Sequence, residues 1–120
     1  MHTKDKGNQG EDIAAGYLRR KNYKIIERNY YSRWGEIDIV AFDEDKGELV
    51  FVEVKARTNN RFGYPEEAVD ERKIEKIEMT INKFLRDYGF EGTRRIDCIA
   101  VEMDYSIRKA KIFHYENIGW

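Results

Sequence analysis

Two carboxylates and a lysine lie at close spacing in two neighbouring segments of the sequence. Asp38 belongs to residues 36–42, and Glu53 and Lys55 belong to residues 49–57. Both segments alternate apolar and polar positions with a period of two, which predicts a pair of β-strands. A polar, turn-prone stretch separates the segments and predicts a β-hairpin. Each strand therefore sets acidic residues among large apolar ones on one of its faces.

The centre of the turn decides which residues of the hairpin face each other. If the centre lies between residues 45 and 46, Asp38 faces Glu53 and Glu36 faces Lys55. A turn centred one residue later would pair Asp38 with Lys55 and give a plain cross-strand salt bridge. The sequence leaves both registers open, and only the first of them brings two carboxylates together.

Two opposed carboxylates in such a hairpin need a cation. Side chains directly opposite in antiparallel strands have Cβ atoms roughly 4.5–5.5 Å apart, so two negative charges there repel each other. The Val, Ile and Phe content is typical of central strands covered on both faces, where a charge must be paired or bind a metal. Mg²⁺ or Mn²⁺ fits, because a hard divalent ion takes oxygen ligands and keeps some of its waters. The alternative is a solvated outer face, on which Asp38 and Glu53 would have no such role.

The same residues resemble a known nuclease motif. An Asp in one strand followed by Glu-x-Lys in the next is the signature of the PD-(D/E)XK nuclease superfamily, and the matching segments here are GEIDIV and FVEVKAR. A longer set of segments is similar to the YraN-like family, which is related to archaeal Holliday-junction resolvases. These segments are GNQGEDIAAGYL, RNYYSRWGEIDIVAFD, LVFVEVKAR, FGYPEEAV and RRIDCIAV. The resemblance covers nearly the whole chain, and it implies a restriction-endonuclease-like αβββαβ core and metal-dependent phosphodiester hydrolysis.

The resemblance also implies a role for each residue of the site. Asp38, Glu53 and the backbone carbonyl of Val54 would bind the metal, with Glu11 as an accessory ligand or orienting group. Lys55 would orient the attacking water or stabilise the charge that builds on phosphate oxygens. Because neighbouring carboxylates favour a charged ammonium, we expect Lys55 to act as an electrostatic group rather than as a base.

Glu11 has a second interpretation, as part of a helix cap. Asn8 is a residue type that caps helices, and it precedes an expected helix over residues 8–21. Glu11 follows Asn8 by three residues, which is the spacing of a capping box. Glu11 also shares a helical stripe with Ala14 and Leu18, so its side chain is expected on the core-facing side. The sequence leaves the cap and the metal ligand open.

Basic and aromatic residues beside the site predict contacts with nucleic acid. A loop over residues 58–65 leaves directly from the strand that carries the Glu-x-Lys motif. Guanidinium groups bind phosphates and aromatic rings stack on bases, whereas a surface loop with chance aromatics is the alternative. The residues that we expect to make these contacts are Arg57, Arg61, Phe62, Tyr64 and Arg33.

Composition and length limit the class of protein. The 120 residues are 41% hydrophobic and 38% charged, which suits one nuclease-like domain over residues 1–120. A single cysteine, Cys98, excludes an internal disulfide, and no run approaches the ~20 apolar residues of a membrane helix. We therefore expect a cytoplasmic protein without membrane contact. His114 has no second histidine or cysteine at ligand spacing, so zinc is not predicted.

Charge is distributed unevenly along the chain. Residues 1–34 contain eight basic and four acidic residues, a net charge of +4, whereas residues 35–55 contain two and seven, a net charge of −5. A bound divalent ion would offset part of the acidic segment and leave the basic segments to meet phosphate. Solvated faces are the alternative for any one charge cluster.

The expected elements give an α/β fold of order αβββαββ. We expect a mixed central sheet flanked by two main helices, with Ile37, Ile39 and Ala41 on one apolar face of the first hairpin strand. Pro65 and Gly89 mark the start and end of the longer helix. The expected helices are residues 8–21 and 66–88, and the expected strands are residues 23–31, 36–42, 49–57, 93–102 and 109–115.

Taken with the resemblance, these patterns predict a Mg²⁺- or Mn²⁺-dependent endonuclease that acts on DNA, with branched or junction DNA as one candidate substrate. By analogy with the resolvases, a homodimer would present two sites to symmetric strands. The main alternative is a catalytically silent nucleic-acid-binding or protein-interaction module on a nuclease fold. A structural ion-pair cluster without any nucleic-acid role is a third hypothesis.

Overall fold

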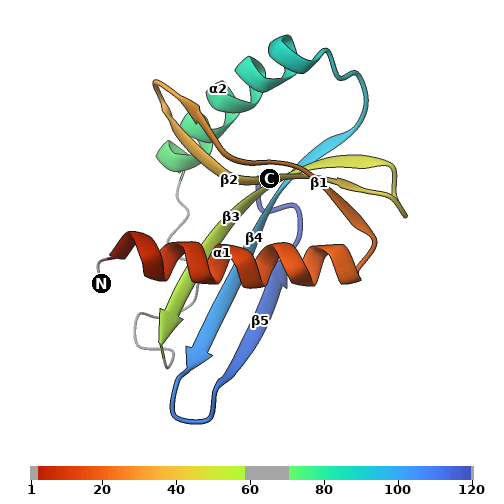
Figure 1. The fold of residues 1–120 in the computed structure, drawn as a ribbon. Coiled ribbons are helices and arrows are strands. Elements are labelled where there is room, and N and C mark those ends of the chain that lie inside the picture. The colour runs from red at the N-terminus through yellow and green to blue at the C-terminus, as the bar shows by residue number, and fades with distance from the viewer. Residues whose placement is uncertain (1–2, 59–70, 120) are drawn as a thin grey trace.

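The chain forms one mixed sheet with a helix packed on either side (Figure 1). The computed structural model describes residues 3–58 and 71–119. Their order is αβββαββ, which confirms the predicted α/β arrangement. The elements are α1 (Thr3–Arg20), β1 (Tyr23–Ser32), β2 (Gly35–Asp43), β3 (Glu48–Thr58), α2 (Glu71–Tyr88), β4 (Arg94–Asp104) and β5 (Lys109–Tyr115).

The strands lie in the order β1-β2-β3-β4-β5, so every strand neighbours the next one in the chain. β3 and β4 run parallel, whereas the other three neighbouring pairs run antiparallel. Parallel neighbours need a long crossover, and the segment that contains α2 supplies it. The sheet is therefore mixed, as the sequence predicts, and β3 is flanked by strands on both edges.

The register of the β2–β3 hairpin confirms the turn centred between residues 45 and 46. Opposed pairs run from Asp43 with Glu48 to Ile39 with Val52. The Asp43 carboxylate accepts two backbone N–H groups of the turn, and Gly47 adopts a left-handed φ of 68°. The alternative register, which would oppose Asp38 to the lysine of β3, is therefore excluded.

Two apolar clusters fill the layers above and below the sheet. The cluster under α1 contains Ala14, Ala15, Leu18, Ile39, Ala41, Val50 and Val52. The cluster under α2 contains Tyr30, Ile37, Val40, Leu49, Phe51, Ile77, Ile81 and Phe84. α1 crosses β3, β4 and β5, whereas α2 lies against the β1–β2 hairpin (Figure 1). The hairpin of β2 and β3 is therefore covered on both faces.

Ile37 lies on the opposite side from the one the sequence predicts. We expected it beside Ile39 and Ala41, but it packs in the cluster under α2. The ladder between β2 and β3 ends at Ile39 and Val52, and before Ile39 β2 pairs with β1 alone. There the two-stranded ribbon curves toward α2 (Figure 1). Strong twist in such a ribbon breaks the period of two relative to the main sheet.

The helix boundaries correct one prediction and confirm another. α1 begins at Thr3, so Asn8 lies inside the helix and the N-cap assigned to it is wrong. Thr3 is itself a residue type favoured at helix starts, and the polar residues after it continue the helix. α2 ends at Tyr88 before Gly89, whose φ of 69° is the expected C-terminal signal, whereas residues 66–70 lie outside the described residues. Within residues 3–58 and 71–119, no helix has the length and apolar character needed to cross a membrane.

A buried network of ion pairs links β4 to the β2–β3 turn. The Arg95 guanidinium, 5% exposed, contacts the Asp97 carboxylate at 3.0 Å and the Asp43 carboxylate at 3.0 Å. Glu48 lies 2.7 Å from the same guanidinium. The Asp97 carboxylate also accepts a hydrogen bond of 2.7 Å from Nε2 of His114. Asp97 is therefore paired with both an arginine and a histidine.

Candidate metal centre

Three carboxylates converge where the N-terminal half of α1 meets β2. Oxygen atoms of Glu11, Glu36 and Asp38 all lie within 4.8 Å of one another. Glu11 comes from α1 and is only 5% exposed, whereas Glu36 and Asp38 come from β2 and are half-buried. The cluster therefore joins two elements that are separate in the sequence.

A close helix–strand contact brings Glu11 into this position. A Cβ added to Gly10 would lie 2.6 Å from the Cβ of Ala56 on β3, so only glycine allows α1 to approach the sheet this closely. The Glu11 carboxylate also accepts hydrogen bonds of 3.0 Å from Arg28 and from Asn29 on β1. Glu11 is thus held at the cluster by side chains of β1, and it does not serve as part of a helix cap.

Asp38 is held against β3 by a backbone hydrogen bond. The N–H of Val54 donates to Oδ2 of Asp38 at 2.8 Å. Burial, followed by the negative charges of Glu53, Glu11 and Glu36, raises the pKa of Asp38 to about 7, although the Val54 N–H opposes this shift. A carboxyl group with so high a pKa lies in surroundings that favour either a bound proton or a bound cation.

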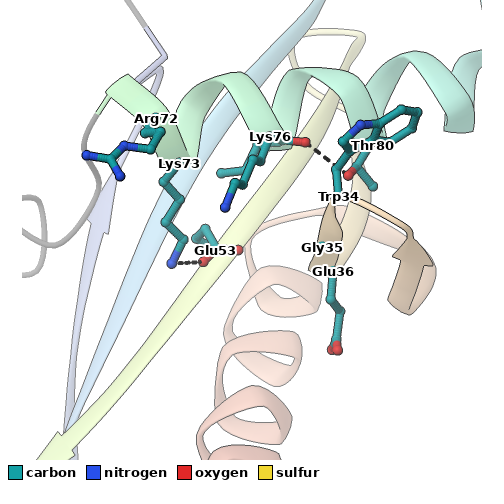
Figure 2. Close-up of a pocket in the computed structure, with 9 residues that line it drawn as sticks. Trp34, Gly35, Glu36, Glu53, Arg72, Lys73, Lys76 and Thr80 are labelled. Carbon is teal, nitrogen blue, oxygen red and sulfur yellow. Dashed lines mark hydrogen bonds and ion pairs between the residues drawn. The ribbon is translucent and has the colours of Figure 1, made fainter.

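Glu53 and Lys55 lie on β3 beside this cluster, and a second lysine, Lys73 of α2, contacts Glu53. The Lys55 ammonium is 3.9 Å from the Glu53 carboxylate, and the Lys73 ammonium of α2 is 2.8 Å from it (Figure 2). Burial and then the nearby Lys73 lower the pKa of Lys55. Burial and a second ammonium therefore outweigh the opposite influence of Glu53 on this pKa, and the role of Lys55 as an electrostatic group stays a prediction. Burial lowers the pKa of Lys73, but its hydrogen bonds to Glu53 and Lys55 and the charges of Glu53 and Asp38 together raise this pKa above its ordinary value.

The donor set fits a hard divalent cation. Mg²⁺ binds oxygen at about 2.0–2.1 Å, so two ligands of one ion lie at most about 4.2 Å apart. The oxygens of Glu11, Glu36 and Asp38 lie within 4.8 Å of one another, and small side-chain rotations would close the difference. The charge of three clustered carboxylates also favours a doubly charged ion over a water molecule.

The predicted ligands are thus only partly brought together. Asp38 and Glu11 share the cluster, whereas Glu53 stands beside it and is engaged by Lys73. Val54 contributes its N–H to Asp38, and the ligand role of its carbonyl stays a prediction. Glu36, which we expected to face Lys55, completes the carboxylate cluster instead.

Sequence reasoning missed the roles of Glu36 and Lys73. Glu36 falls where the β2–β3 ladder has ended, so the hairpin register no longer decides its neighbours. The sequence does carry a signal for Lys73, because Lys73 precedes the buried Ile77 by four residues and so shares the sheet-facing side of α2.

The predicted nucleic-acid contacts have different outcomes. Arg57 contacts Glu102 on β4 at 3.7 Å, with its side chain only 9% exposed. The Arg33 guanidinium lies over the Trp34 ring, 4.7 Å from the ring centroid. The loop residues Arg61, Phe62 and Tyr64 lie outside the described residues.

Relatives of this chain are found over most of its length. Residues 10–101 match the profile of the Uncharacterised protein family UPF0102. A UPF0102 protein of Persephonella marina is 44% identical over 113 residues, which cover 93% of this chain and 90% of the relative. A UPF0102 protein of Fusobacterium nucleatum is 44% identical over 101 residues, which cover 83% of each protein.

Two solved structures share part of the fold. A repair endonuclease from Pyrococcus abyssi matches with a TM-score of 0.44 and 20% identity, covering 78% of this chain and 38% of that chain. An EndoMS–dsDNA2 complex matches with a TM-score of 0.41 and 16% identity, covering 72% of this chain and 34% of that chain. This chain therefore spans well under half of either structure, and likeness at these TM-scores adds nothing to the assignment of the site.

Proposed function

The chain belongs to the UPF0102 family, and we propose that it is a divalent-metal-dependent nuclease that hydrolyses phosphodiester bonds of DNA. The observation that carries the proposal is the convergence of Glu11, Glu36 and Asp38 beside the Glu53–Lys55 pair of β3. The pKa of Asp38, raised to about 7 by burial and by its acidic neighbours, supports a site that requires a cation. Carboxylates gathered where α1 meets β2 and β3 repel one another, which a purely structural cluster would not need.

The three clustered carboxylates would hold one Mg²⁺ or Mn²⁺ ion. Glu53 and the carbonyl of Val54 are further candidate ligands, as the PD-(D/E)XK resemblance implies. A bound ion would polarise a phosphate oxygen and lower the pKa of a coordinated water. The hydrogen bond from the Val54 N–H fixes one oxygen, Oδ2, of Asp38 and so orients this carboxylate beside the other two.

Lys55 would act on the reacting phosphate. Its ammonium, held 3.9 Å from Glu53, can donate to a phosphate oxygen as negative charge builds there. Its pKa is lowered by burial and by Lys73, so a larger fraction of Lys55 is neutral amine than in an exposed lysine, and the neutral amine is the form that can take a proton from water. Lys73 contacts the same oxygen of Glu53, Oε1, at 2.8 Å and is a positioning residue.

The finer parts of the substrate assignment rest on the resemblance to the resolvases. Branched DNA is proposed for that reason, and a homodimer would present two such sites to symmetric strands. Arg33, Arg57 and the loop residues Arg61, Phe62 and Tyr64 are proposed to contact the DNA backbone or bases. Because Arg57 is engaged by Glu102, its contact would require that ion pair to open.

A cleavage assay with matched variants tests the proposal. Linear, flapped and four-way DNA would be incubated with Mg²⁺ or Mn²⁺ and with wild type, Asp38→Ala or Lys55→Met; the exposed Lys109→Met on β5 is the control. We expect metal-dependent cleavage by wild type and the control, and a loss of at least about 100-fold in the other two variants.

Two outcomes would replace the proposal. Wild-type protein that binds DNA but cleaves none of these substrates would favour the silent binding module. Protein that binds neither DNA nor a divalent ion would favour the structural ion-pair cluster.

A further inference from the structure

A cleft opens beside the metal centre, between the β1–β2 turn and the first turns of α2. Its volume is about 430 Å³, within the roughly 300–1,000 Å³ of small-ligand pockets. Figure 2 shows Lys73 and Lys76 reaching from α2 toward the sheet, with Trp34 under the helix. Glu36 and Glu53 form the wall nearest the metal centre. The cleft and the metal centre are therefore continuous.

The α2 wall of the cleft is cationic. Arg72, Lys73 and Lys76 all line it, and Arg72 and Lys76 are exposed. Lys73 is engaged with Glu53, whereas the side chains of Arg72 and Lys76 have no ion-pair partner within residues 3–58 and 71–119. Two such cations at the mouth of a cleft suit an anionic ligand, and phosphate is bound in this way in nucleic-acid complexes.

The opposite wall carries an aromatic ring on a fixed turn. The Trp34 backbone N–H donates to the Ser32 hydroxyl at 3.0 Å, and that hydroxyl lies 2.7 Å from the hydroxyl of Thr80 on α2. Thr80 is 1% exposed, so the turn is tied to a buried point of the helix. The Trp34 ring is half-buried and borders the cleft. A planar base could stack on a ring held in this way.

We propose that this cleft binds one unpaired nucleotide of the substrate strand, with its base against Trp34 and its phosphate against Arg72 and Lys76. This inference rests on the proposed nuclease function and names the substrate class more closely. A base stacked and paired inside a duplex cannot enter a cleft of this size, so the strand must be single or locally opened at this position. The next phosphate along the strand would then face the carboxylate cluster that Glu36 shares with the cleft.

The first test measures metal-free binding of a fluorescein-labelled thymidine single strand by anisotropy, with EDTA present and at low salt. The variant Arg72→Gln/Lys76→Gln should bind about tenfold more weakly than wild type and show a shallower salt dependence, because phosphate contacts are lost. The control Lys109→Gln/Lys111→Gln removes the same charge from exposed positions of β5 and should bind like wild type. Equal weakening in both variants would mean nonspecific attraction and would overturn the inference.

The second test follows Trp34 itself by fluorescence. The background variant is Trp120→Phe, which leaves Trp34 as the remaining tryptophan. The thymidine strand should quench Trp34, whereas a strand of abasic residues with the same phosphates, or a blunt duplex, should leave its emission unchanged. Equal quenching by the abasic strand would rule out base stacking.

These tests separate the cleft from catalysis. Single-strand binding that depends on Arg72 and Lys76 in a protein without cleavage would support the cleft and remove the nuclease proposal. Cleavage by a protein whose single-strand binding is unaffected by Arg72→Gln/Lys76→Gln would support the nuclease proposal and overturn the proposal for the cleft. Since both substituted residues are exposed, the variants should keep the wild-type thermal midpoint, which is measured alongside.

Discussion

Replacing Asp38 with asparagine should stabilise the metal-free protein at pH 8. The pKa of Asp38 is raised from 3.8 to about 7 by burial and by the carboxylates of Glu53, Glu11 and Glu36. Above pH 7 the group is ionised in both the folded and the unfolded chain, and the folded chain carries the unfavourable charge. An amide of the same shape removes that charge and still accepts the N–H of Val54.

The structure sets the size of the effect. A shift of about three pKa units corresponds to ~4 kcal/mol of unfavourable ionisation in the folded state. The hydrogen bond from the Val54 N–H is among the interactions that set this pKa, so its effect is already included and the expected stabilisation is about 4 kcal/mol. For a chain of 120 residues, this gain corresponds to a rise of about 16 °C in Tm.

The pH dependence has a defined sign. Between pH 4 and pH 7 the unfolded chain loses the Asp38 proton while the folded chain keeps it, so wild-type stability falls as pH rises. The advantage of Asp38→Asn should therefore be close to zero near pH 4, grow by about 1.4 kcal/mol per pH unit, and level off above pH 7. Excess Mg²⁺ should stabilise wild type but not the variant.

Urea unfolding in EDTA, followed by circular dichroism at pH 4, 6 and 8, measures this difference. Glu75→Gln, which replaces an exposed carboxylate of α2, is the control and should change stability by less than about 0.5 kcal/mol at every pH. A variant less stable than wild type at pH 8, or a gain independent of pH, would refute the account of Asp38 as a strained carboxylate.

Three further predictions follow from the contacts described above. Arg95→Met should lower the free energy of unfolding, measured in urea, by about 3–5 kcal/mol because it leaves buried carboxylates unpaired. The control Arg94→Met loses only a half-exposed ion pair with Glu78 and should lower the free energy of unfolding by less than about 1 kcal/mol. Gly10→Ala should lower the free energy of unfolding by about 1–3 kcal/mol and weaken Mn²⁺ binding, since the added Cβ would lie 2.6 Å from the Cβ of Ala56. The control Gly16→Ala should leave stability unchanged or raise it, as measured by thermal melts. Equal effects of the two substitutions would contradict the close approach of α1 to the sheet. Mn²⁺ binding should strengthen from pH 5 to pH 7, because the ion displaces the proton held by Asp38. Calorimetry in buffers of different ionisation enthalpy measures the number of protons released. An affinity that does not depend on pH would contradict a proton held by Asp38.

The sequence was most informative where local chemistry decides structure. The polar turn around residues 45 and 46 set the hairpin register, because Asp43 and Gly47 satisfy the turn locally. Alternation then placed Glu53 and Lys55 on one strand, and helical periodicity turned Glu11 toward the sheet.

The sequence was least informative where neighbours come from distant elements. Ile37 changed sides because β2 pairs with β3 only from Ile39 onward, and before Ile39 it follows the curved ribbon with β1. The spacing from Ile77 places Lys73 on the sheet-facing side of α2, but its pairing with Glu53 also depends on where α2 docks on the sheet, which the sequence of α2 does not specify. Asn8 looked like a cap, but helix starts depend on weak local preferences, and Thr3 offered an equivalent signal.

The most direct test of the central claim is the stoichiometry of Mn²⁺ binding, measured by titration calorimetry on wild type, Asp38→Ala and Glu36→Ala, with Glu75→Ala as the control. The account predicts one site per chain in wild type and in the control, and a loss of at least about tenfold in affinity in each cluster variant. Wild-type protein that binds no Mn²⁺ with or without DNA, or binding unchanged by Asp38→Ala, would contradict a metal centre at Glu11, Glu36 and Asp38.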